Sequence, residues 1–309
     1  MATSPPSITP TPVTATANEF IEQQLDSRLC AIESQFGSIH ALSMNCPLVF
    51  GVDDILRNAV EKRYKDGQTK GQPSDKIVII LTTTGGYLET VQRMVDTVRR
   101  FYQVVDFVVP NYAYSAGTVF AMSGDDIYMD YYSRLGPIDP QIESQQGRQV
   151  SALGQLEKYN ALIDKAQNGT ITTAEVQLLI DGFDQAELYN IEQARDLSID
   201  LIRQWLVKFK FKNWKETETR KLTVTDAMKD KRASDIATEL NNTKKWHSHG
   251  YGISMEVLQH DLNLLINDYG KDPVLSHKIR AYHDLLADYM LRRGSEGVMH
   301  VFGVYRSFI

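Results

Sequence analysis

A serine lies among small residues in the stretch NYAYSAGTVFAMSGDD, residues 111–126. Ser115 follows the apolar run DFVVP and precedes a second apolar segment, which is the pattern of a buried strand that turns into a helix. The sequence AYSAG has the spacing of a nucleophile elbow, GxSxG, with Ala113 in place of the first glycine. Serine is also common in turns, so Ser115 is either a catalytic nucleophile or an ordinary turn residue.

Two adjacent glycines, Gly85 and Gly86, follow the apolar run IVIIL at a second predicted strand-to-helix turn. Glycine lets backbone N–H groups approach a ligand closely, and the start of a helix adds partial positive charge. The pair could therefore cradle an anion, or it could be a plain Gly-Gly turn; it does not form the dinucleotide pattern GxGxxG. Gly86 precedes Ser115 by 29 residues, about the length of one βαβ unit, so the two turns can be neighbours at one sheet edge.

Together the two turns could stabilise the tetrahedral intermediate of an acyl-transfer reaction. The N–H of Ala116 directly follows the serine, and the N–H of Gly86 could join it from the neighbouring turn. Two such donors form an oxyanion hole, and the loss of one donor typically costs about 3 kcal/mol of transition-state stabilisation.

The spacing of apolar residues predicts the elements that must position these turns. Strand and helix alternate around Ser115, which predicts βαβ units in a parallel sheet with right-handed crossovers. Upstream of these units we expect a helix, a short strand and a second helix. Downstream of residue 150 the apolar residues of most of the chain have helical spacing. In that part Thr172 and Glu175 form a capping box. The expected strands are 47–51, 77–81, 104–110 and 126–130, and the main expected helices are 19–36, 52–64, 87–102, 116–124, 186–209, 233–242, 253–269 and 277–293.

The fold class is therefore α/β, with a mostly helical C-terminal half. We divide the chain into a disordered Ser/Thr/Pro-rich tail over 1–18, an α/β core over 19–150 and a helical region over 151–309 that completes and covers the core.

Composition excludes several classes of protein. Hydrophobic residues make up 42% and charged residues 23% of the 309 residues, enough to bury a core. The net charge of −6 argues against a nucleic-acid surface, and the basic cluster 208–215 is predicted to be a solvated helix end. The spacing of Cys30 and Cys46 supports neither a metal site nor a disulfide framework. We find no apolar run long enough to span a membrane and no signal peptide. We therefore expect a cytoplasmic protein.

Three stretches in order resemble the Clp/crotonase-fold serine peptidases, which include ClpP, the signal peptide peptidase SppA and the NfeD-type proteases. They are TTTGGYLETVQRMVDTVRR, VPNYAYSAGTVFAMSGDDIYMD and SRLGPIDPQI. The serine dehydrogenase proteinase family is the most similar, since its members carry a Gly-Gly turn, an SAGT stretch and LGPIDPQ. The resemblance spans about residues 45–260 and implies a spiral core of repeated ββα units and a homo-oligomer. It also implies Ser115 as nucleophile, with Gly86 and Ala116 as oxyanion donors.

A serine nucleophile needs a general base, and three side chains are candidates. Lys158 lies 43 residues after Ser115 and resembles the downstream lysine of SppA and NfeD-type relatives; a catalytic lysine must be buried, because desolvation favours its neutral form. His249 resembles the family's histidine, and imidazole is the commonest base near neutral pH. Asp139 would orient a base or simply begin an Asp-Pro turn. ClpP carries its triad histidine near this position and this sequence does not, which argues against a ClpP-type triad.

These observations predict a serine endopeptidase that cleaves peptides or proteins through an acyl-enzyme on Ser115. Lys158 is the preferred base and His249 the alternative, while Gly85 and Asp139 would support the site. No cofactor, metal ion or nucleic-acid partner is expected. One alternative is a crotonase-type acyl-CoA hydrolase or hydratase, although such enzymes usually work without this serine. Another is a non-catalytic peptide-binding scaffold of the same fold.

Overall fold

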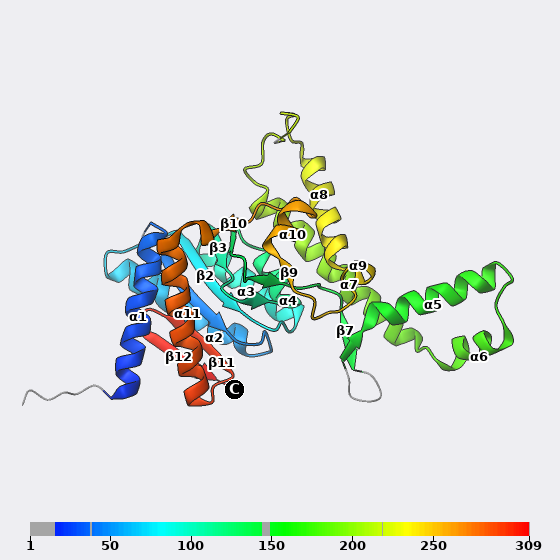
Figure 1. The fold of residues 1–309 in the computed structure, drawn as a ribbon, viewed down its shortest axis with the longest axis horizontal. Helices are drawn as coiled ribbons and strands as arrows, with labels where there is room; N and C mark the ends of the chain where they lie inside the picture. Colours follow the sequence, from blue (N-terminus) through cyan, green and yellow to red (C-terminus); the bar gives the residue numbers. More distant parts are fainter. Residues whose placement is uncertain (1–15, 38, 144–148, 218, 309) are drawn as a thin grey trace, which may run out of the picture.

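A mixed seven-stranded sheet lies at the centre of the molecule (Figure 1). The computed structural model describes residues 16–37, 39–143, 149–217 and 219–308, so most of the predicted disordered tail, residues 1–15, lies outside the described residues. In spatial order the strands are β10 (Asn267–Asp268), β5 (Asp126–Met129), β3 (Val104–Val108), β2 (Lys76–Thr82), β1 (His40–Asn45), β11 (Gly297–Val301) and β12 (Val304–Phe308).

The strands from β10 to β1 run parallel, β11 runs antiparallel to β1, and β12 runs antiparallel to β11. Three of the parallel strands, β2, β3 and β5, coincide with the predicted strands 77–81, 104–110 and 126–130. The predicted α/β class and parallel sheet are therefore confirmed.

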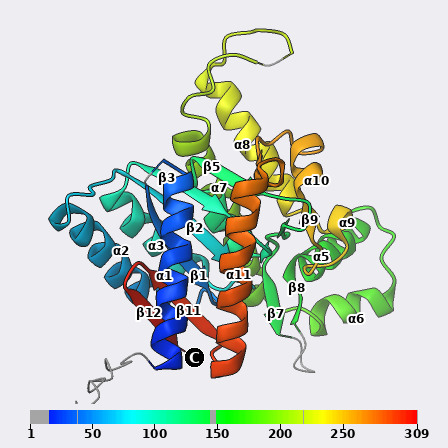
Figure 2. The ribbon, with the colours of Figure 1, turned by 60° about the vertical axis from the view of Figure 1, so that its left-hand side comes forward.

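Helices cover both faces of this sheet. The helices α1 (Ala17–Gln35) and α11 (Pro273–Arg293) lie side by side on one face (Figure 2), where Val78 and Ile80 of β2 pack in their core. The alternate residues Ile77, Ile79 and Leu81 belong to the core on the other face, under α2 (Val52–Thr69) and α3 (Leu88–Phe101). Because successive strand side chains point to opposite faces, the run IVIIL serves both cores.

Beyond residue 140 an arm projects from the body (Figure 1). It begins with the hairpin strands β7 (Gln141–Glu143) and β8 (Gln149–Ser151) and continues into α5 (Ala152–Gln167) and α6 (Thr173–Asp181). The capping box of Thr172 and Glu175 is present as predicted. The chain returns along α7 (Gln185–Trp205) and a π-helical turn (Leu206–Lys210) to α8 (Asp226–Leu240), α9 (Thr243–Trp246) and α10 (Met255–His260), and a 3-10 turn (Tyr269–Lys271) leads to α11.

Two sequence expectations were wrong, and one feature was not expected. The strand expected over 47–51 lies earlier, at β1. In the expected range Leu48 forms a single parallel bridge with Gly86, and the chain then turns at Phe50 and Gly51, where Gly51 has a left-handed φ of 91°. The helix expected over 253–269 ends at His260. The final segment 297–308 forms two strands, not expected from the sequence, that bring the C-terminal part of the chain into the central sheet. No helix in the described ranges is long and apolar enough to cross a bilayer.

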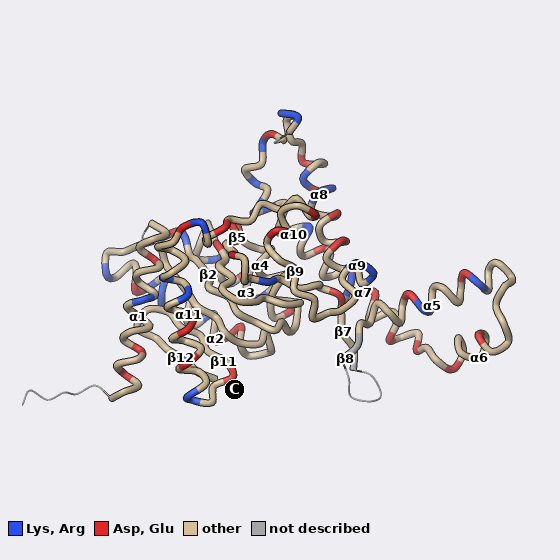
Figure 3. Tube along the Cα trace, in the orientation of Figure 1, with Lys and Arg blue, Asp and Glu red and all other residues tan. Residues whose placement is uncertain are grey.

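The basic cluster 208–215 is only partly solvated. Lys208 and Lys212 are exposed, but the Lys210 side chain is 3% exposed and its Nζ lies 3.7 Å from Asp126 Oδ1. Lys212 pairs with Asp125. Two lysines of this cluster are therefore paired with carboxylates of the body, and acidic and basic residues are interspersed along much of the trace (Figure 3).

Candidate active site

Ser115 occupies a strained backbone conformation at the start of α4 (Ala116–Ala121), with φ 53° and ψ −122°. A positive φ is costly for a residue with a side chain, on the order of 1–3 kcal/mol, and such strain clusters at functional sites. Hydrogen bonds hold the turn in place. The Gly117 N–H donates to Tyr114 O at 2.8 Å, and Thr118 Oγ1 donates to Ala113 O at 2.8 Å. The structure thus presents a half-buried serine on a sharp strand-to-helix turn.

The Gly-Gly turn lies directly against this serine. A Cβ on Gly85 would be 2.8 Å from Ser115 Cβ and 2.7 Å from Tyr114 O, and a Cβ on Gly86 would be 2.2 Å from Leu48 O. Both glycines also have positive φ, 103° and 155°. Only glycine fits this close approach of backbone to backbone. The two turns, 29 residues apart in the sequence, are therefore neighbours as expected.

Two backbone donors remain free beside the serine. Within the described part of the chain, neither the Gly86 N–H nor the Ala116 N–H donates to a protein acceptor. The neighbouring groups of the Gly-Gly turn are paired, because Gly85 O accepts from Leu48 N at 2.8 Å and Leu48 O accepts from Tyr87 N at 2.9 Å. Two unpaired N–H groups next to a serine are suited to bind an oxyanion.

A histidine and an aspartate form a second side-chain pair. His249 Nδ1 lies 2.8 Å from Asp139 Oδ1, and the Asp139 side chain is 3% exposed. The second carboxylate oxygen, Oδ2, accepts from Gln141 Nε2 at 2.9 Å. A carboxylate at Nδ1 favours the tautomer whose proton is on that nitrogen, which leaves Nε2 as a proton acceptor. The His249 side chain is 24% exposed, so it is open on one side.

A small three-stranded sheet brings these residues to one edge. Its strands are β4 (Tyr112–Ala113), β6 (Arg134–Leu135) and β9 (Ile253–Ser254), in that order. Because β4 and β6 are parallel, Ser115 and Asp139 both emerge beyond the same ends of their strands. Because β9 is antiparallel to β6, the segment that precedes β9, with His249, emerges at that edge too.

Lys158 is not part of this group. It is exposed on α5, in the arm that leaves the body, and so lacks the burial that a catalytic lysine needs. The Ser-Lys dyad stays a prediction. Sequence reasoning missed Gln141, whose only sequence signal is its position two residues after Asp139.

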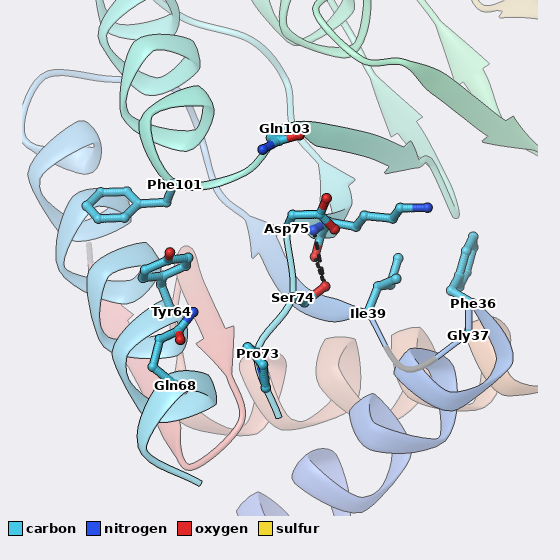
Figure 4. A pocket seen from close by; sticks show the side chains of 11 residues that line it. Phe36, Gly37, Ile39, Tyr64, Gln68, Pro73, Ser74, Asp75, Phe101 and Gln103 are labelled. Atoms are coloured by element: carbon cyan, nitrogen blue, oxygen red, sulfur yellow. Dashed lines mark hydrogen bonds between the residues drawn. The ribbon is translucent and has the colours of Figure 1, made fainter. Parts of the chain in front are cut away.

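A separate cavity of about 630 Å³ lies at the other ends of the parallel strands (Figure 4). Its walls include the aromatic rings of Tyr64 and Phe101 and the polar groups of Asp75 and Gln103. It opens where β2 begins, whereas Ser115 lies beyond the carboxyl ends of the strands. Functional sites of parallel sheets lie at the carboxyl ends, so this cavity is not part of the candidate active site.

The sheet, the serine turn and the glycine turn together define an α/β protein of the ClpP-like class. The chain belongs to the family of ClpP-like SDH-type serine proteinases, which matches residues 63–217, half of its length. The match includes the glycine turn, Ser115 and Asp139, while His249 lies beyond it.

Sequence relatives include two uncharacterized proteins of Methanocaldococcus jannaschii. One is 31% identical over 137 residues, which are 42% of this chain and 46% of that protein. The other is 28% identical over 100 residues, 32% of each. The chain therefore spans about half or less of the length of these relatives.

Solved structures similar to this chain include proteases. ClpP1 from Listeria monocytogenes has a TM-score of 0.40 at 10% identity, over 80% of this chain and 97% of that one. A mutant of the 1510-N membrane-bound stomatin-specific protease has a TM-score of 0.31 at 17% identity, over 51% of this chain and 82% of that one.

Proposed function

We propose that this chain is a serine peptidase that cleaves peptide bonds through an acyl-enzyme on Ser115, with His249 as the general base. The observation that carries the proposal is the strained Ser115 turn, packed against Gly85 beside two free N–H groups. The His249–Asp139 pair at the same edge supports the choice of base. Membership in a family of serine proteinases supports the reaction class.

The first half-reaction forms the acyl-enzyme. His249 Nε2 takes the proton of the Ser115 hydroxyl as Oγ attacks the carbonyl carbon of the peptide bond. The negative charge that develops on the carbonyl oxygen is stabilised by the N–H groups of Gly86 and Ala116. The protonated imidazole, held by Asp139, then gives its proton to the departing amine, and the ester on Ser115 remains.

The second half-reaction releases the acid. Water gives a proton to His249 Nε2 and attacks the ester carbonyl, and the same two N–H groups stabilise the second intermediate. The bond between the carbonyl carbon and Ser115 Oγ then breaks, and His249 returns the proton to Oγ. Asp139 takes no proton in either half-reaction; it orients His249 and stabilises the imidazolium.

Lys158 is the alternative base. For it to act, its ammonium would have to reach Ser115 from the arm of the same or another copy and lose its contact with water. The exposed apolar residues of α6, Leu178 at 49% and Ile180 at 68%, support an oligomer in which the arm contacts another subunit. We therefore test both bases together.

The experiment is labelling with a fluorophosphonate probe, followed by peptide mapping. Wild type is compared with Ser115→Ala, His249→Ala and Lys158→Ala. His277→Ala is the matched control, because His277 is an exposed histidine on α11. Each variant is first checked for folding by circular dichroism and for oligomeric state by size-exclusion chromatography.

We expect label on Ser115 in wild type and in the His277→Ala and Lys158→Ala variants, and at least a hundredfold slower labelling in His249→Ala. Loss of label in Lys158→Ala with normal labelling in His249→Ala would make the lysine the base. A folded wild type that takes no label at Ser115 would contradict the proposed activity and favour the non-catalytic scaffold.

A further inference from the structure

Two aromatic rings stand exposed beside the glycine turn. Phe50 and Tyr87 stack on each other with ring centroids 4.6 Å apart and an interplanar angle of 20°. They are 66% and 49% exposed, so this stacked pair is open to solvent on its outer side. A single exposed aromatic residue needs no explanation, but two stacked rings beside a candidate catalytic turn are an apolar surface of the kind that binds ligands.

The backbone fixes this pair relative to the proposed oxyanion donor. Tyr87 directly follows Gly86, and Phe50 lies two residues after Leu48, which forms a parallel bridge with Gly86. The Leu48 backbone is bonded on both sides, to Gly85 O through its N–H and to Tyr87 N through its carbonyl. The rings therefore come from two separate segments that meet at the glycine turn.

The fold itself does not need these rings. The segment after Phe50 is anchored by Val52 and Leu56, and the segment after Tyr87 by Val91 and Met94, all of which are buried in the core on that face of the sheet. Exposed rings on a frame that is already anchored contribute little to the stability of the free chain. The rings would contribute binding free energy only in a complex in which a ligand covers them.

We propose that Phe50 and Tyr87 form a specificity surface that binds a large apolar side chain of the peptide substrate close to the scissile bond. This inference rests on the proposed function, since it requires the scissile carbonyl oxygen to lie at the Gly86 N–H. Consecutive Cα atoms are about 3.8 Å apart, so a ring on the residue next to Gly86 is within reach of substrate side chains one or two residues from that carbonyl. Burial of an apolar side chain against the two rings stabilises the bound peptide.

A second copy of the chain is a less suitable occupant. Tyr87 is covalently joined to Gly86, so a subunit seated on the rings would also cover the free N–H that the reaction needs. A substrate, by contrast, must come to that N–H in every turnover. The position of the pair therefore favours the peptide over a permanent subunit contact.

The test measures selectivity with two fluorogenic peptides that differ at one position next to the scissile bond, one with Phe and one with Ala. Each peptide pair is made for both sides of the bond, and products are mapped by mass spectrometry. The variants are Phe50→Ala, Tyr87→Ala and the conservative Tyr87→Phe. Phe20→Ala is the matched control, because Phe20 is 58% exposed on α1, on the opposite side of the sheet.

In wild type we expect kcat/KM to favour the Phe peptide over the Ala peptide by about tenfold or more on one side of the bond. This ratio should fall about tenfold in Phe50→Ala and Tyr87→Ala, chiefly through KM. The Tyr87→Phe and Phe20→Ala variants should keep the wild-type ratio.

An unchanged ratio in both alanine variants of an active enzyme would overturn the inference and leave the proposed function intact. A change of oligomeric state in these variants, seen by size-exclusion chromatography, would also overturn it and make the pair a subunit contact. If wild type neither cleaves any peptide nor takes the fluorophosphonate label, the proposed function itself fails.

Discussion

His249 Nδ1 lies 2.8 Å from Asp139 Oδ1, although the two residues are 110 positions apart in the sequence. The carboxylate is nearly fully buried, and its other oxygen accepts from Gln141 Nε2. Both oxygens of Asp139 are thus engaged, which fixes the plane of the carboxylate and, through it, the orientation of the imidazole. This geometry leads to the first two predictions.

The Asp139→Asn variant should lose most of its activity while it keeps its fold. An amide at this position can donate to Nδ1, and that would favour the tautomer with its proton on Nε2, where Ser115 needs an acceptor. We expect kcat to fall by about 10²- to 10⁴-fold, by analogy with other serine peptidases that have a histidine base. Steady-state kinetics with a fluorogenic peptide measures this, and activity within a factor of three of wild type would contradict the role of Asp139.

The Gln141→Leu variant should show a smaller defect of the same kind. Without the amide donor, Asp139 Oδ2 is left as a buried acceptor with no partner, which costs about 1–3 kcal/mol. We expect kcat to fall about tenfold with little change in KM, because Gln141 acts through Asp139 and does not contact the substrate. Gln177→Leu, on the exposed helix α6, is the matched control and should retain wild-type kcat.

The Gly85→Ala variant should be both less stable and inactive. Its new Cβ would lie 2.8 Å from Ser115 Cβ, so one of the two turns must move, at a cost of about 1–3 kcal/mol beyond the strain of a positive φ. Gly37→Ala is the control, because Gly37 also has a positive φ, 87°, but no described atom lies within 4 Å of its added Cβ. The melting temperature and the rate of fluorophosphonate labelling should both be lower in Gly85→Ala than in Gly37→Ala. Equal effects in the two variants would show that the contact with Ser115 does not matter.

Asp106 should make the stability of the fold depend on pH. Burial, reinforced by the nearby carboxylates of Asp126 and Asp125, raises the pKa of Asp106 from 3.8 to about 7, despite the opposing charge of Lys210. Between about pH 4 and pH 7 the folded chain keeps a proton that the unfolded chain has released. The contribution of Asp106 to the free energy of unfolding is therefore fully present below about pH 4 and is lost as the pH rises to about 7.

Replacement of Asp106 by Asn removes this titration. We compare the melting temperature of Asp106→Asn with that of wild type at the same pH. The difference, variant minus wild type, should be larger at pH 8 than at pH 5. Differential scanning calorimetry at the two pH values measures the difference. The Asp164→Asn variant changes an exposed carboxylate on α5 and should show no such trend. A difference between Asp106→Asn and wild type that does not vary with pH would contradict the prediction.

Local patterns in the sequence determined the centre of the fold and half of the candidate site. IVIIL and the runs at 104–110 and 126–130 are buried strands whose apolar residues serve two cores, and this requirement is visible within a few residues. The glycine turn follows β2, and Ser115 follows β4, the short strand that comes directly after β3. The single crossover from β2 through α3 to β3 therefore brings the two turns together. The C-terminal strands β11 and β12 were not recognised. They join the central sheet through the pairing of β11 with β1, a strand far earlier in the sequence, and β12 pairs with β11.

Only the tertiary structure decided which of the candidate titratable side chains pair with one another. The sequence offered Lys158, His249 and Asp139 as alternatives, and local spacing does not show which of them pack together. The antiparallel pairing of β9 with β6 brings the His249 segment to Asp139, whereas the start of α5 carries Lys158 out along the arm. Local periodicity indicates which face of a helix or strand is buried. Contacts between elements more than a hundred residues apart depend on how the whole chain packs, and no short segment encodes that packing.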